Sequence, residues 1–528
     1  MFNKFLITLI FVAIVVRFVG LDYTPPHLSN DEIGAAYAAY SISKTLKDGS
    51  DKFLPILWTS HGGQGSPLAV YIPLVSIVFL GNNDFAVRLP SAILGSLTII
   101  FIGLLVLELT KNTRLALISS FLLAFSPWHL SASRRALETN YALFFIVLGL
   151  YLFFIGMSRN KNWATLASMV VFALSIYSYY AEWVLTPLII FSLIVFYRKT
   201  ILKRKIYFVA ILLLGILLLP LFFNFIQHLK SSRASSEFIT QDVGVGRRLS
   251  KHPNPIQKGQ IVLKAIADKY STYNSLDYLF FFGASILPKE NPYQFGFFLT
   301  PFLIPFILGL VKVRIFFNKH SNFIYFLLIA SPLAASLTLG EINNWRSLPQ
   351  LLPVAIITAV GLLYLWKFIK EYIWMKVLGL GLLLISLFYF CLAYFIHFPI
   401  EQAEGYQYGY KQVAEYINKH YPEFEKIIID PRFGNKEYYY IGVPSSYIPF
   451  YTNLDPTKVQ QAKHIPFGIA FDKYEFREIN WDGEKVEENY LYVVPRDNAP
   501  DPSKELKVVY EIPLPSHKIE FKLYSLIN

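Results

Sequence analysis

Long apolar runs dominate this sequence and leave few folds open to it. Between about residue 5 and residue 397 the chain has several apolar runs of roughly 16 to 24 residues, the length that a helix needs to cross a bilayer. Only 16% of all residues are charged and 54% are hydrophobic, whereas soluble chains carry about 25% charged residues. The sequence therefore predicts an α-helical, multi-pass membrane protein.

The apolar runs predict about 11 membrane-spanning helices. These lie near 5–21, 86–109, 115–131, 140–157, 163–180, 183–197, 206–226, 295–311, 322–339, 350–366 and 377–397. A further apolar stretch, 67–80, is about 14 residues long, which is short for a span and suits an interfacial or re-entrant helix. The first run could also be a signal peptide, but no small-residue cleavage site follows it, so an uncleaved helix is expected.

Charge sets the predicted topology. The chain has 48 Lys and Arg against 36 Asp and Glu, a net charge of +12. In a membrane protein such an excess belongs to cytoplasmic loops, so it indicates orientation and no nucleic-acid partner. If 67–80 does not cross, the basic loops such as 198–205 (RKTILKRK) all share the side of the N-terminus. We therefore expect a cell-membrane protein with its N-terminus in the cytoplasm and its C-terminal residues outside.

Two domains are predicted from the change in character near residue 398. Residues 1–397 form the transmembrane domain, with long outer loops at 22–85 and 227–294. From 398 to 528 the apolar runs shorten to strand length and are separated by turns and an amphipathic helix near Gly409–His420. This part is predicted to be a soluble, extracytoplasmic α/β domain.

Ionisable residues at the predicted outer face are few, and two carboxylates stand out. Asp31 and Glu32 follow the first helix, and neighbours on a helix point about 100° apart. We therefore expect separate roles: one carboxylate as a general base facing a cavity, the other paired with a cation such as Arg88. The alternative is a solvated acidic turn that only favours the helix dipole.

Several arginines also lie at the predicted outer face, where positive charge is disfavoured. They are Arg88, Arg134, Arg135 and Arg346. A single interfacial arginine often only extends its charge to water. Several together suit the binding of a lipid phosphate, which guanidinium groups hold with paired hydrogen bonds.

The order of these segments resembles a known family. It runs from Asp31-Glu32 through Ser66-Pro67-Leu68 and residues 86–95 (AVRLPSAILG) to 126–129 (SPWH) with Ser133-Arg134, and later 343–349 (NNWRSLP). It is similar to the GT-C membrane glycosyltransferases of the protein-O-mannosyltransferase and aminoarabinose-transferase type. The resemblance is clear over about residues 1–200 and weaker to about residue 400.

The resemblance implies transfer of a sugar from a polyprenyl-phosphate donor, with inversion, to a glycan, lipid or protein acceptor on the outer face. It implies Asp31 near the acceptor and Arg88 near the donor phosphate. Where some relatives place a later second carboxylate, this chain offers only Glu138. His61 stands in a departure from the family pattern (HGGQGSPL), so no role is carried over to it.

Other functions fit the sequence less well. A transporter or lipid-linked-saccharide flippase would have mid-helix charges and two similar halves, and a polysaccharide polymerase or ligase would not need the Asp-Glu pair. The single cysteine, Cys391, excludes a disulfide framework, and no residues have metal-ligand spacing. No cofactor and no metal site are predicted, although a divalent cation is left open.

Overall fold

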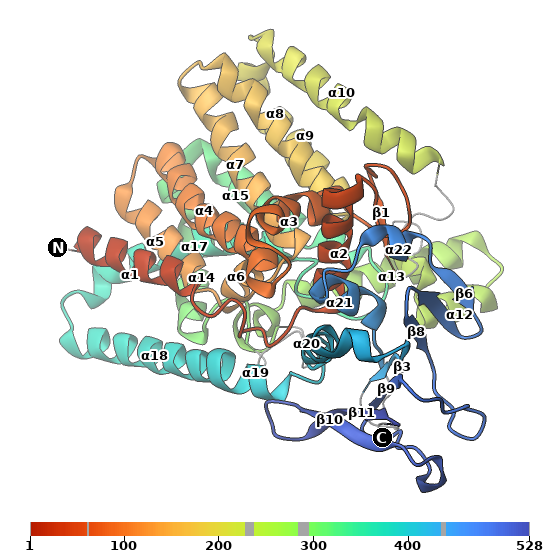
Figure 1. The fold of residues 1–528 in the computed structure, drawn as a ribbon. Coiled ribbons are helices and arrows are strands. Elements are labelled where there is room, and N and C mark those ends of the chain that lie inside the picture. The colour runs from red at the N-terminus through yellow and green to blue at the C-terminus, as the bar shows by residue number, and fades with distance from the viewer. Residues whose placement is uncertain (1, 61–62, 228–236, 284–294, 434–439, 527–528) are drawn as a thin grey trace. The chain divides into compact units, whose positions relative to one another are not determined.

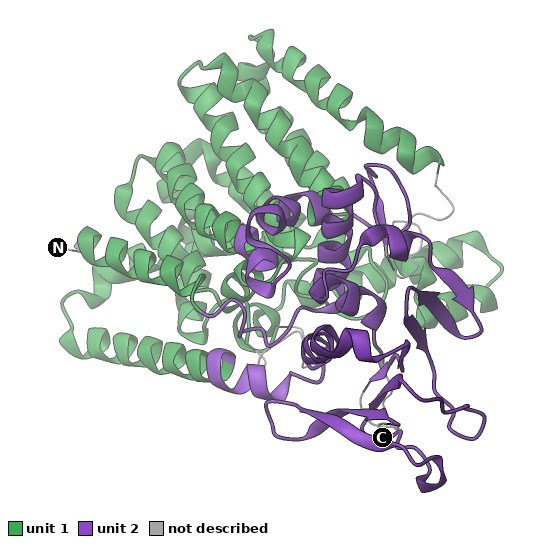
Figure 2. Ribbon diagram, viewed as in Figure 1, with its two compact units in different colours: residues 1–19, 66–69, 91–393 green, residues 20–65, 70–90, 394–528 purple. Residues whose placement is uncertain are grey.

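The computed structural model describes residues 2–60, 63–227, 237–283, 295–433 and 440–526 (Figure 1). Two compact units make up the chain (Figure 2). Unit 1 contains residues 1–19, 66–69 and 91–393, and unit 2 contains residues 20–65, 70–90 and 394–528. Most of the segment predicted to be the first outer loop, 22–85, thus belongs to the same unit as the C-terminal residues, a grouping that nothing in the sequence indicates. Of the predicted outer loop 227–294, residues 228–236 and 284–294 lie outside the described part.

The named elements in the described part of unit 1 are helices and short helical turns. Its helices are α1 (Phe2–Val16), α4 (Asp84–Thr110, in this unit from Ser91), α5 (Thr113–Ala124), α6 (Pro127–Ser133), α7 (Glu138–Ser158), α8 (Asn162–Ser178), α9 (Glu182–Ile201), α10 (Ile206–Gln227), α12 (Val243–Lys251), α13 (Pro255–Tyr273), α14 (Leu303–Phe317), α15 (Ser321–Ala330), α16 (Leu333–Ser336), α17 (Leu351–Ile369) and α18 (Ile373–Cys391). Short 3-10 or π turns are η1 (Ile239–Gln241), η2 (Asp277–Phe281), η3 (Thr300–Phe302), η4 (Asn318–His320) and η5 (Leu348–Gln350).

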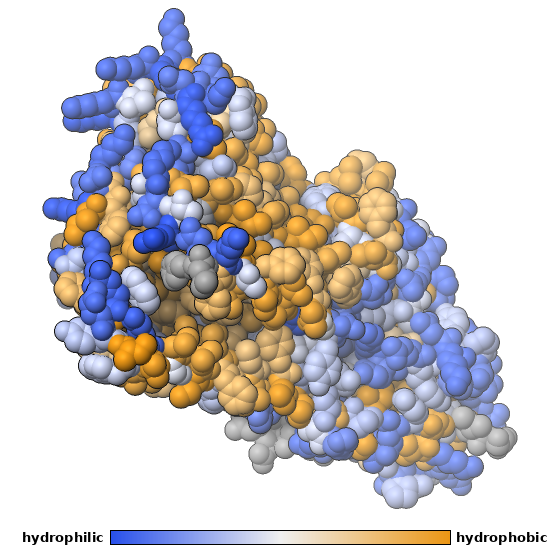
Figure 3. Space-filling model, turned by 90° about the vertical axis from the view of Figure 1, so that its left-hand side faces the viewer, coloured by the Kyte–Doolittle hydropathy of each residue, from blue (hydrophilic) through white to orange (hydrophobic). Residues whose placement is uncertain are grey.

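The helices have the character of membrane spans. Within the described residues, seven helical segments are long and apolar enough to cross a bilayer, or eight if the bent pair α5–α6 is one span. The apolar windows of α10 and α18 are only 17% buried within the protein, and Figure 3 shows broad hydrophobic areas on the face in view. Exposed apolar areas of this extent mark surfaces that contact a membrane or another protein. The multi-pass membrane character is confirmed, whereas the count of about 11 spans is not.

The predicted third span, 115–131, is broken into two helices. α5 ends at Ala124, and α6 begins at Pro127 after a bend of 68°. Ser126 caps α6 because its Oγ accepts a hydrogen bond from the amide of His129. Proline at the first helical position needs no amide partner. The Ser-Pro pair therefore starts a new helix at this point.

Close helix packing in unit 1 depends on glycine. α14 and α17 make an extended contact, and a Cβ on Gly309 would collide with the carbonyl oxygen of Ile357. Small residues let helix backbones approach each other, which is how helices associate inside a bilayer. α17 itself is buried over its first eleven residues. This pair therefore forms part of the core of unit 1.

Unit 2 combines residues 20–65 and 70–90 with the C-terminal residues. Its helices are α2 (Asn30–Thr45), α3 (Pro67–Leu80, in this unit from Val70), the start of α4 up to Pro90, α19 (Phe398–Glu401), α20 (Tyr410–His420), α21 (Pro444–Tyr451) and α22 (Pro456–Gln460), with the turns η6 (Leu392–His397, from Tyr394), η7 (Tyr421–Glu423) and η9 (Pro502–Lys504). Its strands are β1 (Trp58–Ser60), β2 (Gly63–Gly65), β3 (Lys426–Ile429), β4 (Arg432–Phe433), β5 (Tyr440–Ile441), β6 (Lys463–Ile465), β7 (Gly468–Phe471), β8 (Tyr474–Arg477), β9 (Tyr490–Pro495), β10 (Lys507–Pro513) and β11 (Ile519–Ser525).

A mixed seven-stranded sheet organises the C-terminal residues. The strand order is β10-β11-β9-β3-β8-β7-β6, and β3 is parallel to both β8 and β9. The apolar run Ile427–Ile429 of β3 is fully buried, as expected for a central strand covered on both faces. The predicted α/β character of these residues is confirmed.

Candidate functional site

The first turn of α2 is shaped by a capping box. Ser29 caps the helix: its Oγ accepts a hydrogen bond from the Glu32 amide at 3.4 Å, while Oε2 of Glu32 accepts from the Ser29 amide at 2.9 Å. Ser-x-x-Glu is the sequence that produces this exchange. The Glu32 carboxylate is therefore turned back toward the start of the helix and away from solvent.

Arg88 meets Glu32 in the interior of unit 2. Its Nε donates to Oε1 at 3.0 Å and its Nη2 to Oε2 at 3.3 Å, and both side chains are fully buried. Nη1 donates to the carbonyls of Leu21 and Pro25, each at 2.8 Å, and Nη2 also donates to the carbonyl of His27. A guanidinium has five N–H donors. All five are therefore engaged, and Arg88 fixes the 21–27 turn against α2.

Asp31 stands beside this buried pair but outside it. It precedes Glu32 in the first turn of α2 and is exposed, while Glu32 is fully buried. Because neighbouring helical side chains point about 100° apart, the two carboxylates have opposite surroundings within unit 2. One carboxylate is saturated by hydrogen bonds, and the other remains open to a partner.

A buried histidine with tyrosine neighbours lies next to Arg88, and the sequence analysis did not identify it. The ring of His27 lies 4.8 Å from that of Tyr447 between centroids, and Tyr451 donates a hydrogen bond to Asp84 at 2.6 Å. Burial lowers the pKa of His27 to about 4; Arg88 and Lys411 lower it too, while Asp84 opposes them. The imidazole is therefore neutral at pH 7. Both tyrosines come from α21, more than 400 residues further along the chain, so no local pattern reveals the cluster.

The adjacent arginines of unit 1 have different surroundings. Arg134 is fully buried, and its Nη1 donates to the carbonyls of Val16 and Val19 at 2.6 and 2.7 Å. Arg135 places its guanidinium carbon 4.7 Å from the centre of the Trp345 ring. Arginine stacked on tryptophan is held by a cation–π attraction. The structure thus brings the segment after α6 onto the segment before α17.

Arg346 lies one residue after that tryptophan. Its Nη1 donates to Thr338 Oγ1 at 2.8 Å and to the Leu339 carbonyl at 2.7 Å, and its Nη2 lies 3.5 Å from Glu237. Its side chain is 17% exposed. Glu138, the first residue of α7, is half-buried. Arg134, Arg135 and Glu138 are thus close in the chain, and Arg135 and Arg346 are linked through Trp345.

Arg17 is a further buried cation that the sequence analysis did not select. It donates to the carbonyls of Ala13 and Ala124 and lies 3.0 Å from Nδ1 of His129 and 3.3 Å from Oγ of Ser133. It joins α1 to the end of α5 and to α6. The run SPWH at 126–129 thus supplies a helix cap and a histidine that contacts this arginine.

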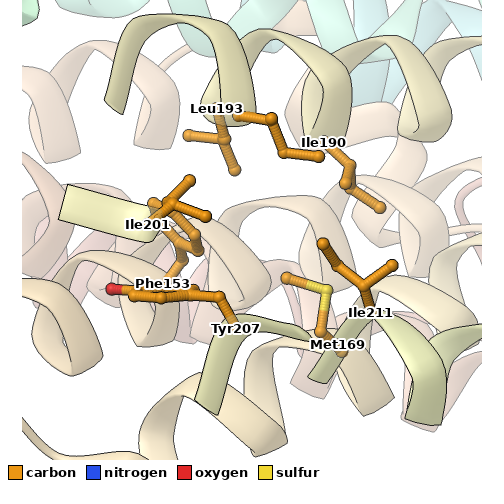
Figure 4. A pocket seen from close by; sticks show the side chains of 8 residues that line it. Phe153, Met169, Ile190, Leu193, Ile201, Tyr207 and Ile211 are labelled. Atoms are coloured by element: carbon orange, nitrogen blue, oxygen red, sulfur yellow. The ribbon is translucent and has the colours of Figure 1, made fainter. Parts of the chain in front are cut away.

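Two further observations concern metal ligands and an internal cavity. Among the described residues, no group of three His, Cys, Asp or Glu side chains is placed to hold a metal ion. The apolar cavity in Figure 4, lined by Phe153, Met169, Ile190, Leu193, Ile201, Tyr207 and Ile211 among others, measures about 10 Å³. A space of that size holds about one water molecule. It is therefore no substrate site.

Comparison with known proteins identifies the fold. Residues 64–223 match the family model described as dolichyl-phosphate-mannose-protein mannosyltransferase. ArnT from Cupriavidus metallidurans, crystallised with undecaprenyl phosphate, matches with a TM-score of 0.55 and 12% identity over 99% of this chain and 98% of that chain. Its apo form gives a TM-score of 0.56 and 13% identity over 99% of this chain and 97% of that chain.

One further protein is similar in sequence, and its description gives no activity. It is an uncharacterized protein of Aquifex aeolicus (strain VF5), 25% identical over 372 residues, which cover 70% of this chain and 71% of the relative. The conclusion about the fold therefore depends on the family model and on ArnT. The chain has the fold of the GT-C membrane glycosyltransferases, and the resemblance that its sequence predicts is confirmed.

Proposed function

We propose that this chain transfers a sugar from a polyprenyl-phosphate-linked donor to an acceptor at the outer face of the membrane, with inversion. One observation carries the proposal: Glu32 is committed to Arg88, while the adjacent Asp31 is exposed. A glycosyl transfer from a phosphate needs one carboxylate free to accept a proton. Asp31 is such a carboxylate, and it lies in the first turn of α2, which the buried Glu32–Arg88 pair fixes in place.

In this reaction Asp31 acts as the general base. It accepts the proton of the acceptor hydroxyl as the oxygen of that hydroxyl bonds to the anomeric carbon of the sugar. The bond between that carbon and the phosphate oxygen breaks, and polyprenyl phosphate leaves with the electron pair. A single displacement of this kind inverts the configuration at the anomeric carbon. The phosphate is already a fair leaving group, so no separate acid is required.

Cationic side chains are needed for the negative charge that develops on the phosphate. We assign this role to Arg134, Arg135 and Arg346, and we keep Glu138 as a candidate second carboxylate. Arg88 has no N–H donor left over. Its proposed contribution to donor use is therefore indirect: it holds Glu32 and the 21–27 turn, and with them the start of α2 that carries Asp31.

The comparisons support a polyprenyl-phosphate donor. The ArnT crystal structure contains undecaprenyl phosphate, and the family model is named for a dolichyl-phosphate-linked donor. By extension, we propose that residues 1–397 form the transmembrane glycosyltransferase domain in the cell membrane, with the N-terminus in the cytoplasm. Residues 398–528 form its extracytoplasmic domain, and the acceptor is a glycan, a lipid or a protein.

Glycan and glycolipid mass spectrometry tests the proposal. Cells that lack the chain are complemented with the wild type, with Asp31→Asn, or with Asp22→Asn, which removes another exposed carboxylate of the same segment. One glycosylated species should be absent without the chain and return with the wild type and with Asp22→Asn. Asp31→Asn should leave it at a small fraction of the wild-type level. No difference between cells with and without the chain would refute the proposed function.

A further inference from the structure

A second pocket lies in unit 1, at the ends of several apolar helices. The pocket has a volume of about 930 Å³ and is formed by the C-terminal ends of α4, α7 and α9 together with η4. Pockets that take small molecules commonly measure about 300–1,000 Å³. Its lining includes Glu108, Lys111, Val195, Arg198, Lys199 and Lys319. None of them belongs to the proposed glycosyl-transfer site.

The lining has two chemically distinct parts. One part is apolar and includes Phe154, Met157 and Val195; Val195 is 46% exposed. The other part carries charge, with four cations against a single carboxylate. A solute that fits both parts must itself be amphipathic and anionic. This combination is what a phospholipid offers, with its phosphate next to acyl chains.

The one carboxylate of the pocket is already neutralised. Glu108 forms ion pairs of 2.8 Å with both Lys111 and Arg159, and it accepts a hydrogen bond from Ser158. No ion pair within the described residues involves Arg198, Lys199 or Lys319. These three side chains carry the positive charge that an anion would meet. The site is therefore electrostatically open to a phosphate.

α9 is kinked directly before two of these cations, Arg198 and Lys199. Tyr197 has non-helical backbone angles, φ −112° and ψ 16°, directly before Arg198 and Lys199. Its hydroxyl makes a 2.6 Å hydrogen bond with Nδ1 of His320, and Tyr197 and His320 are both buried. The bond fixes the kink against η4. The last turn of α9, which carries both cations, is thereby held at an angle set by the fold.

We infer that this pocket binds the phosphate headgroup of an anionic membrane lipid, with an acyl chain along its apolar wall. Helix ends lie at headgroup depth, and basic pockets between membrane helices are known to attract anionic lipids. The competing explanation is that the cations only reach toward water and offset the partial negative charge of the helix ends. That explanation requires no pocket, and it predicts that removing any two exposed cations of segment 198–205 has the same effect on lipid binding.

Lipid binding to the full chain separates the two explanations. Native mass spectrometry of the purified chain measures the affinity for phosphatidylglycerol, with phosphatidylcholine as the neutral lipid. The variant Arg198→Gln/Lys199→Gln removes two cations that line the pocket. The control Lys203→Gln/Lys205→Gln removes two exposed cations that follow α9 and do not line the pocket. Lys319→Gln tests the pocket from a different element.

We expect the wild type to prefer phosphatidylglycerol over phosphatidylcholine. Since each cation near a lipid surface contributes about 1 kcal/mol, Arg198→Gln/Lys199→Gln should weaken phosphatidylglycerol binding by about thirtyfold. Lys319→Gln should weaken it by about fivefold, and the control by less than about twofold. Equal losses in both double variants would overturn the inference. Displacement of the lipid by millimolar inorganic phosphate would instead assign the pocket to soluble phosphate and would also overturn it.

Discussion

Nε of Arg88 lies 3.0 Å from Oε1 of Glu32, and neither side chain is exposed. Charged groups are expensive to bury unless they are paired and fully hydrogen-bonded. Here the three carbonyls of residues 21, 25 and 27 take the remaining donors of the guanidinium. Each member of the ion pair therefore needs the other in order to be buried. Because Asp31 directly precedes Glu32 in α2, the ion pair also fixes the position of Asp31.

The first prediction concerns the stability of this pair. Glu32→Gln keeps the shape of the side chain but leaves the Arg88 charge buried without its counter-charge, which should cost about 3–5 kcal/mol. We expect a clear drop in the melting temperature of the purified chain, measured by size-exclusion chromatography after heating. Asp31→Asn serves as the matched control, since its side chain is exposed. Equal melting temperatures for the two variants would contradict the ion-pair account.

The second prediction concerns catalysis by Asp31. If Asp31 accepts the proton, Asp31→Asn should lower kcat by about 10²–10⁴ while the KM for the donor changes little. The acid limb of the pH–rate profile should disappear with the carboxylate. The assay uses purified chain with a polyprenyl-phosphate sugar. Turnover at the wild-type rate would exclude Asp31 as the base and direct attention to Glu138.

The third prediction concerns the pH dependence of stability. His27 has a pKa of about 4 in the folded chain because it is buried, compared with 6.5 when exposed. The unfolded chain therefore binds a proton more readily, and stability is lost as the pH falls from about 6.5 to about 4, by roughly 3 kcal/mol in all. His27→Gln should flatten the melting temperature over this range. His464→Gln, at an exposed position, should retain the wild-type slope; equal slopes in all three proteins would argue against this origin.

The fourth prediction concerns topology. With Cys391 replaced by serine, a cysteine at the exposed position Ser503 should react with an impermeant maleimide in intact cells. A cysteine at the exposed Lys203, in the RKTILKRK loop, should react only after the membrane is opened. Protection of the residue at 503 in intact cells would reverse the predicted orientation.

The sequence predicts the membrane fold well because that fold depends on local properties. A span needs a continuous apolar run, and positions such as 140–157 and 350–366 are visible as such without any tertiary information. The number of spans is harder to predict because bends and short helices interrupt the runs. Ser126-Pro127 is one example: hydropathy continues through it, while the capping serine and the proline start a new helix.

In the candidate site, too, the features set by local sequence are predictable and those set by tertiary contacts are not. The different surroundings of Asp31 and Glu32 follow from helical geometry and from the capping box, both of which are local. The role of Arg88 does not, because its partners include three backbone carbonyls that become acceptors only when the 21–27 turn folds over it. His27 was missed for a similar reason. Its neighbours Tyr447 and Tyr451 arrive from α21, and no spacing in the sequence encodes that contact.

The last prediction concerns the arginines of unit 1. Arg135 stacks on Trp345, and the next residue, Arg346, is held by Thr338 and Leu339. If this cluster binds the donor phosphate, Arg346→Lys keeps the charge but loses the paired donors of the guanidinium. The KM for the donor should then rise by about tenfold, since a charge-assisted hydrogen bond contributes about 1.5–3 kcal/mol.

Two comparisons make this test specific. Trp345→Leu removes the ring under Arg135 and should raise the same KM, because the arginine loses its fixed position. Arg248→Gln removes an exposed cation of α12 and should leave the KM for the donor within about twofold of the wild type, since screening weakens distant surface charges. Michaelis constants measured separately for donor and acceptor show which substrate the arginine cluster contacts. A rise in the acceptor KM alone would place this cluster at the acceptor, because only the substrate that contacts the altered side chains loses binding energy.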